Sequence, residues 1–597
     1  MRRRTLLTGA AALMLTPAAG AMAARAAALR RVRPGDPNWP APELWRGLAK
    51  RVGGRLVQPK SLLAACADPA QADACGAARK AMFNPFFLGG QVGGAQVSGY
   101  FKAWTPEPSA YAIVALTAED VAQGVNFACE HNLRLVVKGP GHSYLGCSNA
   151  PDSLLIWTRA MDQVSVHDAF RPLGGDTAFP AVSVGGGAIW LDVYHAVSVE
   201  AGRYVQGGAC TDVGVAGLVQ GGGFGSLSKA FGVAGAGLLE AEVVTADGRI
   251  RTVNAHRDPD LFWALKGGGG GSFAVVTRAT LRTHDLPAVF GAVDVTLKAW
   301  SDEAFRALLD QFLGIYADRL MNPHWGEQVH VQGNNTLSIS MLSQGLGEAE
   351  MRAAWTPLLD WAADPSHGVA VTAPFTAASI PARAYWDLRR RAEMGLKDVV
   401  FDTRPDAPAW HGWWKRDAAQ AGVYLYGFDS LWLPRSLLDP AGRPALVAAL
   451  FDASRTHDVA LYFNKGLAGA PSEAIAAARD TPMNPDVLGA FALAMVFDGG
   501  PPAFPGSPFG PPNLVAAQRT ADRIAQAMQR LRQAAPGAGS YVAESSFFNE
   551  NWRTDYWGEH YPRLRRVKAR YDPHGLFFTH HGVGSEDWSA DGFTRRA

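Results

Sequence analysis

Short blocks of apolar residues, separated by polar and glycine-rich turns, dominate the chain between residues 107 and 286. Four of these blocks have the length of strands and end at turn residues: 112–116, 133–137, 153–157 and 181–184. After the first block, Thr117 and Asp120 have the spacing of a capping box that opens a helix. A further helix is predicted over residues 190–200. This alternation of strands and helices is typical of the α/β or α+β class.

The pattern continues with a β-hairpin and a short helix. Residues 242–245 and 249–253 are strand-like and flank an Asp-Gly dipeptide, which favours a tight turn. Asp258 and Pro259 then have the composition of a helix start, with the aspartate as the cap and the proline in the first turn. The segment therefore predicts two paired strands followed by a capped helix.

Residues 287–540 show longer strand-like runs that alternate with amphipathic helices. The strand candidates are 289–297, 329–341, 424–432 and 491–497, and the helix candidates are 303–316 and 472–479. The pattern predicts an antiparallel sheet backed by helices, which would hold a substrate. Tyr424, Tyr426 and Trp432 share one strand face, where they either line a cavity or belong to the core. The proline-rich stretch 499–512 predicts a loop, with an entrance to the cavity as one place for it.

Length and charge narrow the function classes. A chain of 597 residues is too long for one ordinary domain, so two or more lobes are expected. The formal net charge of +2 gives no argument for a nucleic-acid partner. No run of 18 apolar residues follows the N-terminal segment, so no membrane span is expected.

The first 26 residues have the pattern of an export signal. Arg3 and Arg4 precede an apolar centre, and small residues at 21–23 form a cleavage site. The arginine pair is typical of a twin-arginine signal, and the alternative is an ordinary secretory signal. The sequence therefore predicts a bacterial protein that is exported, periplasmic or secreted, with the twin-arginine machinery as a partner in transit. Residues 27–106 predict a helical N-terminal extension.

Five cysteines are distributed over three kinds of segment. In an oxidising compartment, Cys66 and Cys75 are close enough in sequence to close a small loop by a disulfide. Cys129 falls on the apolar face of a predicted helix and is expected to be a small buried residue. Cys147 and Cys210 lie in glycine-rich loops, which is where a reactive thiol would be placed.

Three glycine-rich clusters accompany the predicted strands. The first, GPGHSYLGC at 139–147, places histidine, serine and tyrosine side chains between glycines. A glycine turn that exposes N–H groups after a strand suits a pyrophosphate, and the alternative is a plain surface turn. The second spans 207–225 and encloses a predicted helix at 213–219, and the third spans 267–271. None fits G-x-G-x-x-G, so a Rossmann dinucleotide site is disfavoured.

Three motifs, in their order and spacing, resemble the berberine-bridge-enzyme-like flavoproteins of the vanillyl-alcohol-oxidase superfamily: GPGHSYLGCSN, GGACTDVGVAGLVQGGGFG and DLFWALKGGGGGSFAVVT. The resemblance resumes at 556–575. It implies an α+β fold with a PCMH-type FAD-binding domain of two α/β subdomains over 107–286. A substrate domain with an antiparallel sheet backed by helices would follow over 287–540. Residues 541–597 would return to the FAD domain.

The resemblance implies FAD as the cofactor, held covalently by His142 and Cys210. In that family the histidine is bonded to the flavin 8α-methyl group and the cysteine to flavin C6. Imidazole and thiolate can both add to an electron-poor ring, and the alternatives are a hydrogen-bonding His142 and a free Cys210. The other candidates for cofactor binding belong to the first two motifs: Gly139, Gly141, Ser143, Gly146, Val213, Gly217, Gly221, Gly222 and Gly223.

One position of these motifs bears on the hydrogen-bond donors available to the cofactor, and another bears on the type of reaction. Pro140 replaces the glycine that usually stands there in the family, and proline has no N–H to donate. Val213 matches a position near flavin C4a where a small residue leaves room for dioxygen; the alternative is a valine of the helix core. This favours an oxidase that passes electrons to O2. A dehydrogenase with another electron acceptor is the alternative, and a non-catalytic flavin-binding protein is disfavoured.

Tyr144, Glu544 and His581 are the candidate catalytic residues. Oxidation of a small alcohol, sugar or phenolic substrate needs a hydride acceptor and a base for the hydroxyl proton. Tyr144 matches an active-site tyrosine of the family, whereas Glu544 stands where the family's Tyr-x-Asn-Tyr pattern is replaced. His581, which adjoins His580 in a glycine-flanked turn, is a further candidate for the base. No residues have convincing metal-ligand spacing, and no hydrolase triad is indicated.

Overall fold

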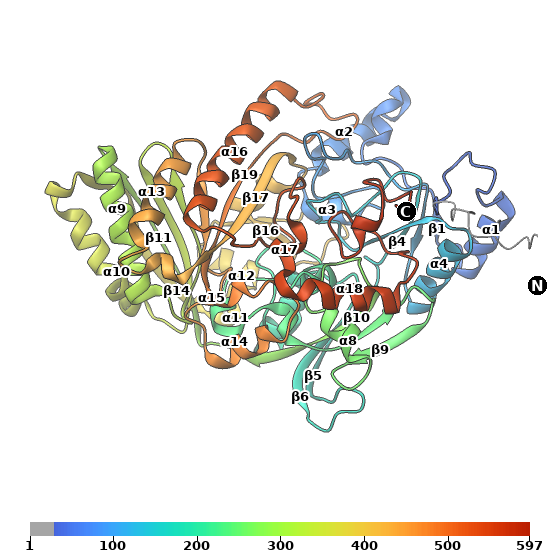
Figure 1. Ribbon diagram of the computed structural model, residues 1–597, viewed down its shortest axis with the longest axis horizontal. Coiled ribbons are helices and arrows are strands. Elements are labelled where there is room, and N and C mark those ends of the chain that lie inside the picture. The colour runs from blue at the N-terminus through green and yellow to red at the C-terminus, as the bar shows by residue number, and fades with distance from the viewer. Residues whose placement is uncertain (1–28, 597) are drawn as a thin grey trace, which may run out of the picture.

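The computed structural model describes residues 29–596 and has two lobes (Figure 1). The first lobe holds two sheets and both ends of the described chain, and the second is built on one large sheet. The predicted export signal lies outside the described residues. Within 29–596, no helix is long and apolar enough to cross a membrane.

A four-stranded sheet of order β1-β2-β4-β3 begins the first lobe. Its strands are β1 (Leu56–Val57), β2 (Tyr111–Val114), β3 (Arg134–Lys138) and β4 (Ser153–Trp157). β4 pairs in parallel with β2 and β3. Helix α4 (Ala118–Glu130) starts at the predicted capping box, where the Thr117 hydroxyl accepts a hydrogen bond from the Asp120 N–H at 3.2 Å. The GPGHSYLGC loop leaves this sheet at the carboxyl end of β3.

The second sheet is antiparallel, with the order β5-β6-β10-β8-β9 and with β7 paired to β10. Its strands are β5 (Val164–Phe170), β6 (Phe179–Gly185), β7 (Arg203–Val205), β8 (Leu238–Val244), β9 (Ile250–Asn254) and β10 (Val275–Asp285). β8 and β9 form the predicted hairpin. The associated helices are α5 (Trp190–Tyr194), the π-helical turn η3 (His195–Glu200), α6 (Val215–Gln220), α7 (Ser228–Phe231), η4 (Ala234–Gly237) and α8 (Pro259–Ala264).

Helix α8 starts where predicted, with Asp258 at the N-cap position and Pro259 in the first turn. Asp258 has a left-handed φ of 48°, however, and its side chain makes no cap hydrogen bond. Its carboxylate instead accepts a hydrogen bond from the Tyr571 hydroxyl at 2.7 Å. A long-range contact to the C-terminal helix therefore replaces the local cap.

The second lobe is a seven-stranded antiparallel sheet of order β14-β11-β13-β12-β18-β19-β17. Its strands are β11 (Val289–Ala299), β12 (Trp325–Gln332), β13 (Thr336–Gln344), β14 (Val369–Pro381), β17 (Tyr424–Pro434), β18 (Val459–Tyr462) and β19 (Ala490–Gly500). Helices α9 (Asp302–Ile315), α10 (Glu348–Ala363), α13 (Arg443–Ser454) and α16 (Leu514–Ala534) pack on it and share one apolar core with it (Figure 1). The expected antiparallel sheet backed by helices is present.

One predicted strand of this lobe is two strands. The run 329–341 is divided into β12 and β13 by the turn 333–335, in which Asn335 has a left-handed φ of 64°. The apolar alternation continues in phase across that turn, which hid it from the sequence pattern. The predicted aromatic face of β17 is mainly structural, because Trp432 packs on Phe224 within a buried cluster.

The N-terminal extension consists of α1 (Pro42–Arg51), η1 (Ala64–Ala67), η2 (Pro69–Gln71), α2 (Ala72–Ala81) and α3 (Pro85–Gly89). Cys66 and Cys75 form the expected disulfide within it. The proline-rich loop packs on this extension, where Gly506 O accepts hydrogen bonds from the Arg79 guanidinium. The prediction that Cys129 is buried is wrong, because this cysteine is exposed near the end of α4.

A segment of residues 382–421, called here the crossover segment, leaves the second lobe and packs on the first. It contains α11 (Ala382–Tyr385), α12 (Leu388–Glu393), β15 (Val399–Phe401), β16 (Gly412–Trp414) and η7 (Lys415–Gln420). The ring of Trp386 stacks on Tyr194 with 3.9 Å between centroids. The indole N–H of Trp414 donates to Ala209 O at 2.9 Å. The segment thus lies beside the loop that carries Cys210.

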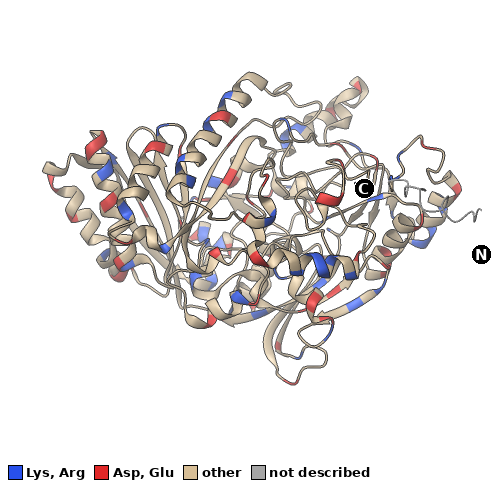
Figure 2. Ribbon diagram, viewed as in Figure 1, with Lys and Arg blue, Asp and Glu red and all other residues tan. Residues whose placement is uncertain are grey.

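The C-terminal residues return to the first lobe, where α18 lies beside α8 and α17 packs against α18 (Figure 1). Their bounds are α17 (Trp552–Trp557), η9 (Gly558–His560), α18 (Tyr561–Tyr571) and η10 (Ser585–Asp587). The remaining short elements are η5 (Tyr316–Leu320), η6 (Pro365–His367), η8 (Arg435–Leu438), α14 (Ser472–Arg479) and α15 (Asp486–Gly489). Cationic and anionic side chains are interspersed over both lobes, in keeping with the small net charge (Figure 2).

Candidate functional site

His142 and Cys210 lie at the same cavity, although 68 positions separate them in the sequence. The cavity has about 410 Å³ of empty space, part of it open to solvent. Three parts of the chain enclose it: the N-terminal extension, the loops after β3 and β7, and the crossover segment. Its lining residues are Pro85, Gln96, Val97, His142, Tyr144, Cys210, Thr211, Asp212, Trp413, Asp417, Gln420 and Ala421.

The imidazole of His142 is held by a carboxylate from the second glycine motif. Its Nε2 lies 2.5 Å from Oδ2 of Asp212, whose side chain is 9% exposed. Within residues 29–596, Nδ1 of His142 has no hydrogen-bond partner. The ring is therefore oriented through one nitrogen, and the other nitrogen remains available to a ligand.

The thiol of Cys210 shares the cavity with the Asp417 carboxylate. Burial, and next the charge of Asp417, raise the pKa of this thiol well above its ordinary value. Burial raises the pKa of Asp417 to about 6, against the opposing influence of the Arg416 guanidinium. Arg416 lies between two carboxylates, with its Nε 3.8 Å from Asp417 and its NH2 group 3.7 Å from Glu327.

The backbone of the loop that carries His142 requires glycine at positions 141 and 146, and the proline at position 140 packs against a neighbouring loop. Gly141 and Gly146 have φ values of 90° and 73°, which side-chain-bearing residues rarely adopt. The ring of Pro140 lies against Gly214, where an added Cβ would come within 2.7 Å of the proline Cδ. Pro140 therefore packs the first motif onto the second, which gives this departure from the family pattern a structural role.

The predicted glycines of the second motif fall into two groups. Gly222 and Gly223 face packed side chains, since an added Cβ would lie 2.2 Å from Met483 and from Leu218 respectively. These two positions serve close packing rather than an open cradle. Gly217, by contrast, has open space, since an added Cβ would meet no other atom within 4 Å, and Gly221 faces the Tyr541 hydroxyl at 3.4 Å. Gly139 has open room as well, with its nearest neighbours at 3.7 Å or more.

Ser143 and Val213 also serve the local structure of their loops. The Ser143 hydroxyl accepts a hydrogen bond from the Cys147 N–H at 3.1 Å, which closes the turn after the histidine. The carbonyl of Val213 accepts a hydrogen bond from the Trp190 N–H at 3.0 Å. The half-buried Val213 side chain lies beside the apolar core of the second sheet.

Two of the three predicted catalytic residues come together. Burial, and next the charge of Glu544, raise the pKa of Tyr144 far above its ordinary value, and the same two causes act on Tyr462. The Glu544 carboxylate forms a 2.5 Å ion pair with Nζ of Lys465. Tyr144 also packs against Phe428 of β17, with 5.1 Å between ring centroids. The second lobe thus supplies Lys465, Tyr462 and Phe428 to this side of the site.

The third candidate, His581, does not reach this cavity. Its ring stacks on Trp552 and on His580, with centroid distances of 5.4 and 3.9 Å. Burial and the neighbouring His580 lower the pKa of His581 to about 3, which makes it a weak base. His580 is engaged with Phe547 O at 2.8 Å. The histidine pair therefore belongs to the packing of the C-terminal segment, and the prediction of a catalytic His581 is corrected.

The comparisons with known proteins agree with this geometry. Residues 108–254 match the family model of an FAD binding domain, and residues 540–584 match that of berberine and berberine-like proteins. The chain is 29% identical over 596 residues to the VAO-type flavoprotein oxidase VAO615 of Thermothelomyces thermophilus, with 94% of each chain covered. The crystal structure of MtVAO615 from Myceliophthora thermophila C1 superposes with a TM-score of 0.78 and 26% identity, covering 95% of this chain and all of that one.

This chain is an FAD-linked oxidoreductase. Its fold is of the VAO/PCMH type, which confirms the α+β prediction. Glucooligosaccharide oxidase from Acremonium strictum shares that fold with a TM-score of 0.59 and 21% identity, covering 83% of this chain and 94% of that one. The relatives named here are fungal, and they lend no support to the prediction of a bacterial source or of twin-arginine export.

The glycine motifs of the oxidoreductase suit FAD, because buried polar atoms in and beside them lack a hydrogen-bond partner within the described residues. Thr211 Oγ1, Gln220 Oε1 and Ser272 Oγ are buried without a hydrogen-bond partner, and all three lie in or beside the glycine motifs. Buried polar atoms of this kind are usually satisfied by a ligand or a water molecule. Gly217 and Gly270 adjoin each other there, since an added Cβ on Gly270 would lie 3.8 Å from Gly217 O. Small residues and free polar groups together suit a polar cofactor at close range.

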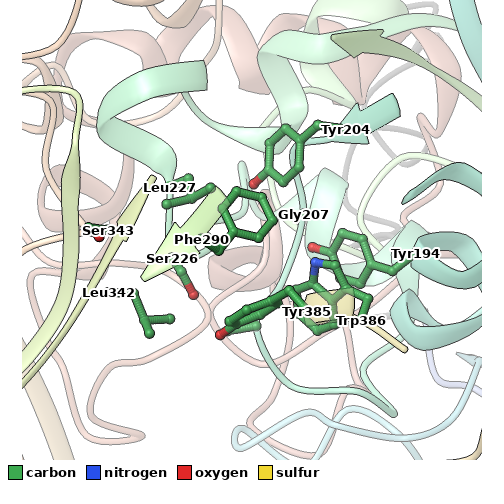
Figure 3. Close-up of a pocket in the computed structure, with 11 residues that line it drawn as sticks. Tyr194, Tyr204, Gly207, Ser226, Leu227, Phe290, Leu342, Ser343, Tyr385 and Trp386 are labelled. Carbon is green, nitrogen blue, oxygen red and sulfur yellow. The ribbon is translucent and has the colours of Figure 1, made fainter. Parts of the chain in front are cut away.

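A second cavity is lined in part by Gly207 and Ala209, which precede Cys210 in the same loop (Figure 3). It has about 320 Å³ of empty space and is bounded by aromatic rings of both lobes and the crossover segment. The labelled rings of Tyr204, Phe290, Tyr385 and Trp386 surround it. The Tyr194 hydroxyl donates to Gly208 O at 2.9 Å, so part of its polar lining is engaged with the Cys210 loop.

Several residues of the site escaped the sequence pattern. Asp417 and Lys465 have no motif around them and reach the site only through the fold. Lys138 could have been noticed in the sequence, because it is a charged residue directly after the apolar run 133–137. It is buried beneath the His142 loop, where its Nζ donates to Gly94 O at 2.8 Å and Gln91 O at 3.2 Å. Lys138 thereby fastens the N-terminal extension to the loop.

Proposed function

We propose that the oxidoreductase is an oxidase that carries FAD covalently on His142 and Cys210 and oxidises a small alcohol, sugar or phenolic compound. The observation that carries this proposal is that both nucleophiles line one cavity, beside Tyr144. The name of the glucooligosaccharide oxidase structure describes a 6-S-cysteinyl, 8α-N1-histidyl FAD. That linkage uses the same two side-chain types as this cavity offers.

Bound FAD supplies the acceptor for the hydride of the substrate. Glu544 accepts the proton of the substrate hydroxyl, and the Lys465 ammonium, 2.5 Å away, balances the carboxylate charge. The protonated Tyr144 hydroxyl donates a hydrogen bond to the substrate oxygen, since burial and the charge of Glu544 keep its pKa far above neutrality. Tyr462 and Phe428 exclude water from that side. Tyr144 and Glu544 are the catalytic residues of this proposal.

Dioxygen is the proposed electron acceptor. Val213 is small and half-buried, at the position where the family resemblance puts access to flavin C4a. Other proteins of the same fold are also oxidases, including a chitooligosaccharide oxidase and a xylooligosaccharide oxidase. These names favour a carbohydrate among the proposed substrate classes.

Acid precipitation of the full-length chain tests the cofactor proposal. We expect a yellow pellet from the wild type, from His142→Ala and from Cys210→Ala, because either remaining bond retains the flavin. The double variant should give a colourless pellet. A colourless wild-type pellet would rule out covalent attachment.

Reoxidation of the photoreduced enzyme by air tests the oxidase proposal. We expect reoxidation within seconds for the wild type and a clear slowing in Val213→Phe, whose ring would fill the space beside the loop. A panel of oligosaccharides and benzylic alcohols, assayed by hydrogen peroxide release, then identifies the substrate class. Wild-type reoxidation over minutes would favour a dehydrogenase with another acceptor.

We also propose that the protein is exported. The basic and apolar pattern of residues 1–26 supports this, and so does the Cys66–Cys75 disulfide, which is typical of oxidising compartments. N-terminal sequencing of the mature protein should give a start near residue 24, and secretion from a twin-arginine-deficient host separates the two kinds of signal. A mature protein that retains Met1 in the cytosol would contradict the proposal.

A further inference from the structure

Each of the two proposed flavin anchors has a carboxylate close to it. Asp212 contacts His142 at 2.5 Å, and Asp417 lines the same cavity as Cys210, whose pKa is raised mainly by burial and by the charge of Asp417, with a smaller effect of Asp212. We infer that Asp212 and Asp417 are the separate proton acceptors for the histidyl and cysteinyl flavin bonds. This inference rests on the proposed covalent attachment and assigns a role to Asp212, which lies in the second glycine motif, and to Asp417, which lies in no motif.

Asp212 determines which imidazole nitrogen can attack. Because Nε2 lies 2.5 Å from the Asp212 carboxylate, the neutral ring keeps its proton on Nε2 and its lone pair on Nδ1. Within the described residues nothing competes for Nδ1. The Asp212 side chain is 9% exposed, so the acceptor is shielded from water.

The histidyl bond can be written with its protons and electrons balanced. Nδ1 of His142 bonds to the 8α carbon, which loses one proton, and the Nε2 proton passes to Asp212. The two electrons released pass through the isoalloxazine ring to dioxygen, which also takes up the 8α proton and the proton held by Asp212 and leaves as hydrogen peroxide. The product histidine is neutral, because Asp212 has taken the proton that would otherwise leave a cationic ring.

At Cys210 the proposed role of Asp417 is to deprotonate the thiol. The thiolate is the nucleophilic form of cysteine, yet burial raises the pKa of this thiol well above its ordinary value. A local base is therefore needed, and the Asp417 carboxylate, which lines the same cavity as the thiol, can supply one. Arg416, 3.8 Å from Asp417, holds the carboxylate in place and favours its charged form.

The cysteinyl bond balances in the same way. The S–H proton of Cys210 passes to Asp417 as sulfur bonds to flavin C6, and C6 loses its own proton. The two electrons again pass through the isoalloxazine ring to dioxygen, which takes up the C6 proton and the proton held by Asp417 and leaves as hydrogen peroxide. The two steps use different acceptors from different elements: Asp212 lies in the loop before α6, and Asp417 lies in η7 of the crossover segment. The two bonds should therefore be separable by mutation.

A tryptic digest resolves the two bonds, because the anchors fall on different peptides. Cleavage after Lys138 and Arg159 releases His142 on peptide 139–159, and cleavage after Arg203 and Lys229 releases Cys210 on peptide 204–229. Full-length wild type, Asp212→Asn and Asp417→Asn are purified with flavin, denatured, digested and measured by mass spectrometry. Asparagine keeps the shape of aspartate and cannot accept the proton.

We expect wild type to yield both peptides joined through one FAD. In Asp212→Asn the flavin should be found on peptide 204–229, with at least tenfold less on 139–159. Asp417→Asn should show the reverse. Asp192→Asn is the matched control, because Asp192 also binds a histidine, His411 at 2.7 Å, without lining the cavity. It should keep both bonds.

The outcomes separate the inference from the proposal on which it rests. Flavin-free peptides in the wild type would refute covalent attachment itself. Wild-type levels of both bonds in Asp212→Asn and Asp417→Asn, or loss of both bonds in each variant, would overturn the assignment of separate acceptors. Where an Asn variant fails to fold, Asp212→Glu and Asp417→Glu keep a base and should form both bonds. Loss of the bond that belongs to the other carboxylate in a Glu variant would also overturn the inference.

Discussion

At the scale of single residues, the site is defined by pairs of titratable groups. His142 with Asp212, Cys210 with Asp417, and Lys465 with Glu544 each join a reactive group to a partner of complementary chemistry. Burial makes these pairs important, since an unpaired charge in such a place is costly. Two predictions belong at this scale.

Replacement of Glu544 by glutamine should reduce the rate of flavin reduction. The amide cannot accept the hydroxyl proton, so we expect a loss of roughly 10²–10⁴-fold, with covalent flavin unchanged. Stopped-flow measurement of the flavin absorbance during anaerobic mixing with substrate gives this rate directly. Glu550→Gln, an exposed change in the same segment, is the control and should behave as wild type. A wild-type rate in Glu544→Gln would assign the base to another group.

Replacement of Asp417 by asparagine should change the pH dependence of stability. The folded pKa of about 6 exceeds the ordinary value of 3.8, so the folded state binds more protons than the unfolded state between these values, and stability falls as pH rises from about 4 to about 6. Asn removes this cost, which is roughly 2–3 kcal/mol at full effect. Arg416, Glu327, Asp212 and Cys210 surround the carboxylate.

The measurement compares unfolding midpoints of Asp417→Asn/Cys210→Ala with Cys210→Ala alone, so that loss of a flavin bond does not confuse the result. The advantage of the asparagine variant should be larger at pH 7 than at pH 4.5. An advantage that is independent of pH would mean that Asp417 titrates normally.

At the scale of elements, the site depends on loops that follow strands and pack on each other. The His142 loop leaves β3, the Cys210 loop follows β7, and Pro140 packs the first onto Gly214 of the second. The crossover segment then adds Asp417 beside the Cys210 loop. Loop placement by rigid sheets is what lets residues distant in sequence share one cofactor.

Replacement of Gly214 by alanine should therefore reduce the fraction of protein in which the histidyl–flavin bond forms. Its φ is −71°, so the backbone tolerates alanine, but the new Cβ would lie 2.7 Å from Pro140 Cδ. We expect a stability loss of about 1–3 kcal/mol and a reduced fraction of flavin on peptide 139–159. Thermal unfolding and the tryptic digest measure the two effects. Restoration by the double variant Gly214→Ala/Pro140→Gly is the control; unaltered flavin attachment in Gly214→Ala would contradict the packing role of Pro140.

At the scale of the whole molecule, buried lysines fasten one part to another. Lys229 of α7, in the first lobe, donates from Nζ to Gly466 O at 2.8 Å, Ala468 O at 3.0 Å and Phe491 O at 3.1 Å in the second. These three carbonyls would lose their partner together. The lobes enclose the site between them, so their alignment bears directly on substrate binding.

Replacement of Lys229 by methionine should destabilise the joint between the lobes. Methionine fills similar volume but removes the Nζ donor from three buried carbonyls, of which Phe491 O keeps the Tyr316 hydroxyl as a donor, at a cost of roughly 2–4 kcal/mol. Thermal unfolding followed by circular dichroism should show a lower midpoint. Lys60→Met removes an exposed lysine and should leave the midpoint unchanged. Equal midpoints for Lys229→Met and wild type would show that these hydrogen bonds do not hold the lobes.

The sequence predicted the local elements well and the long-range contacts poorly. Periodicity located α4 and the β8–β9 hairpin, because both are specified by adjacent residues. The glycine motifs located His142 and Cys210 through the family resemblance. No residue next to Asp417 or Lys465 in the sequence indicates a role for them. They reach the site only because the crossover segment and the second lobe pack against the first lobe. His581 was misjudged because a reactive side chain and a packed one look alike in sequence.

The central claim is that His142 and Cys210 hold the same FAD molecule, and mass spectrometry of the wild-type tryptic digest tests it most directly. The account predicts one species in which peptides 139–159 and 204–229 are joined through a single FAD, and its disappearance in His142→Ala and in Cys210→Ala. Recovery of both peptides free of flavin from a flavin-loaded preparation would contradict it.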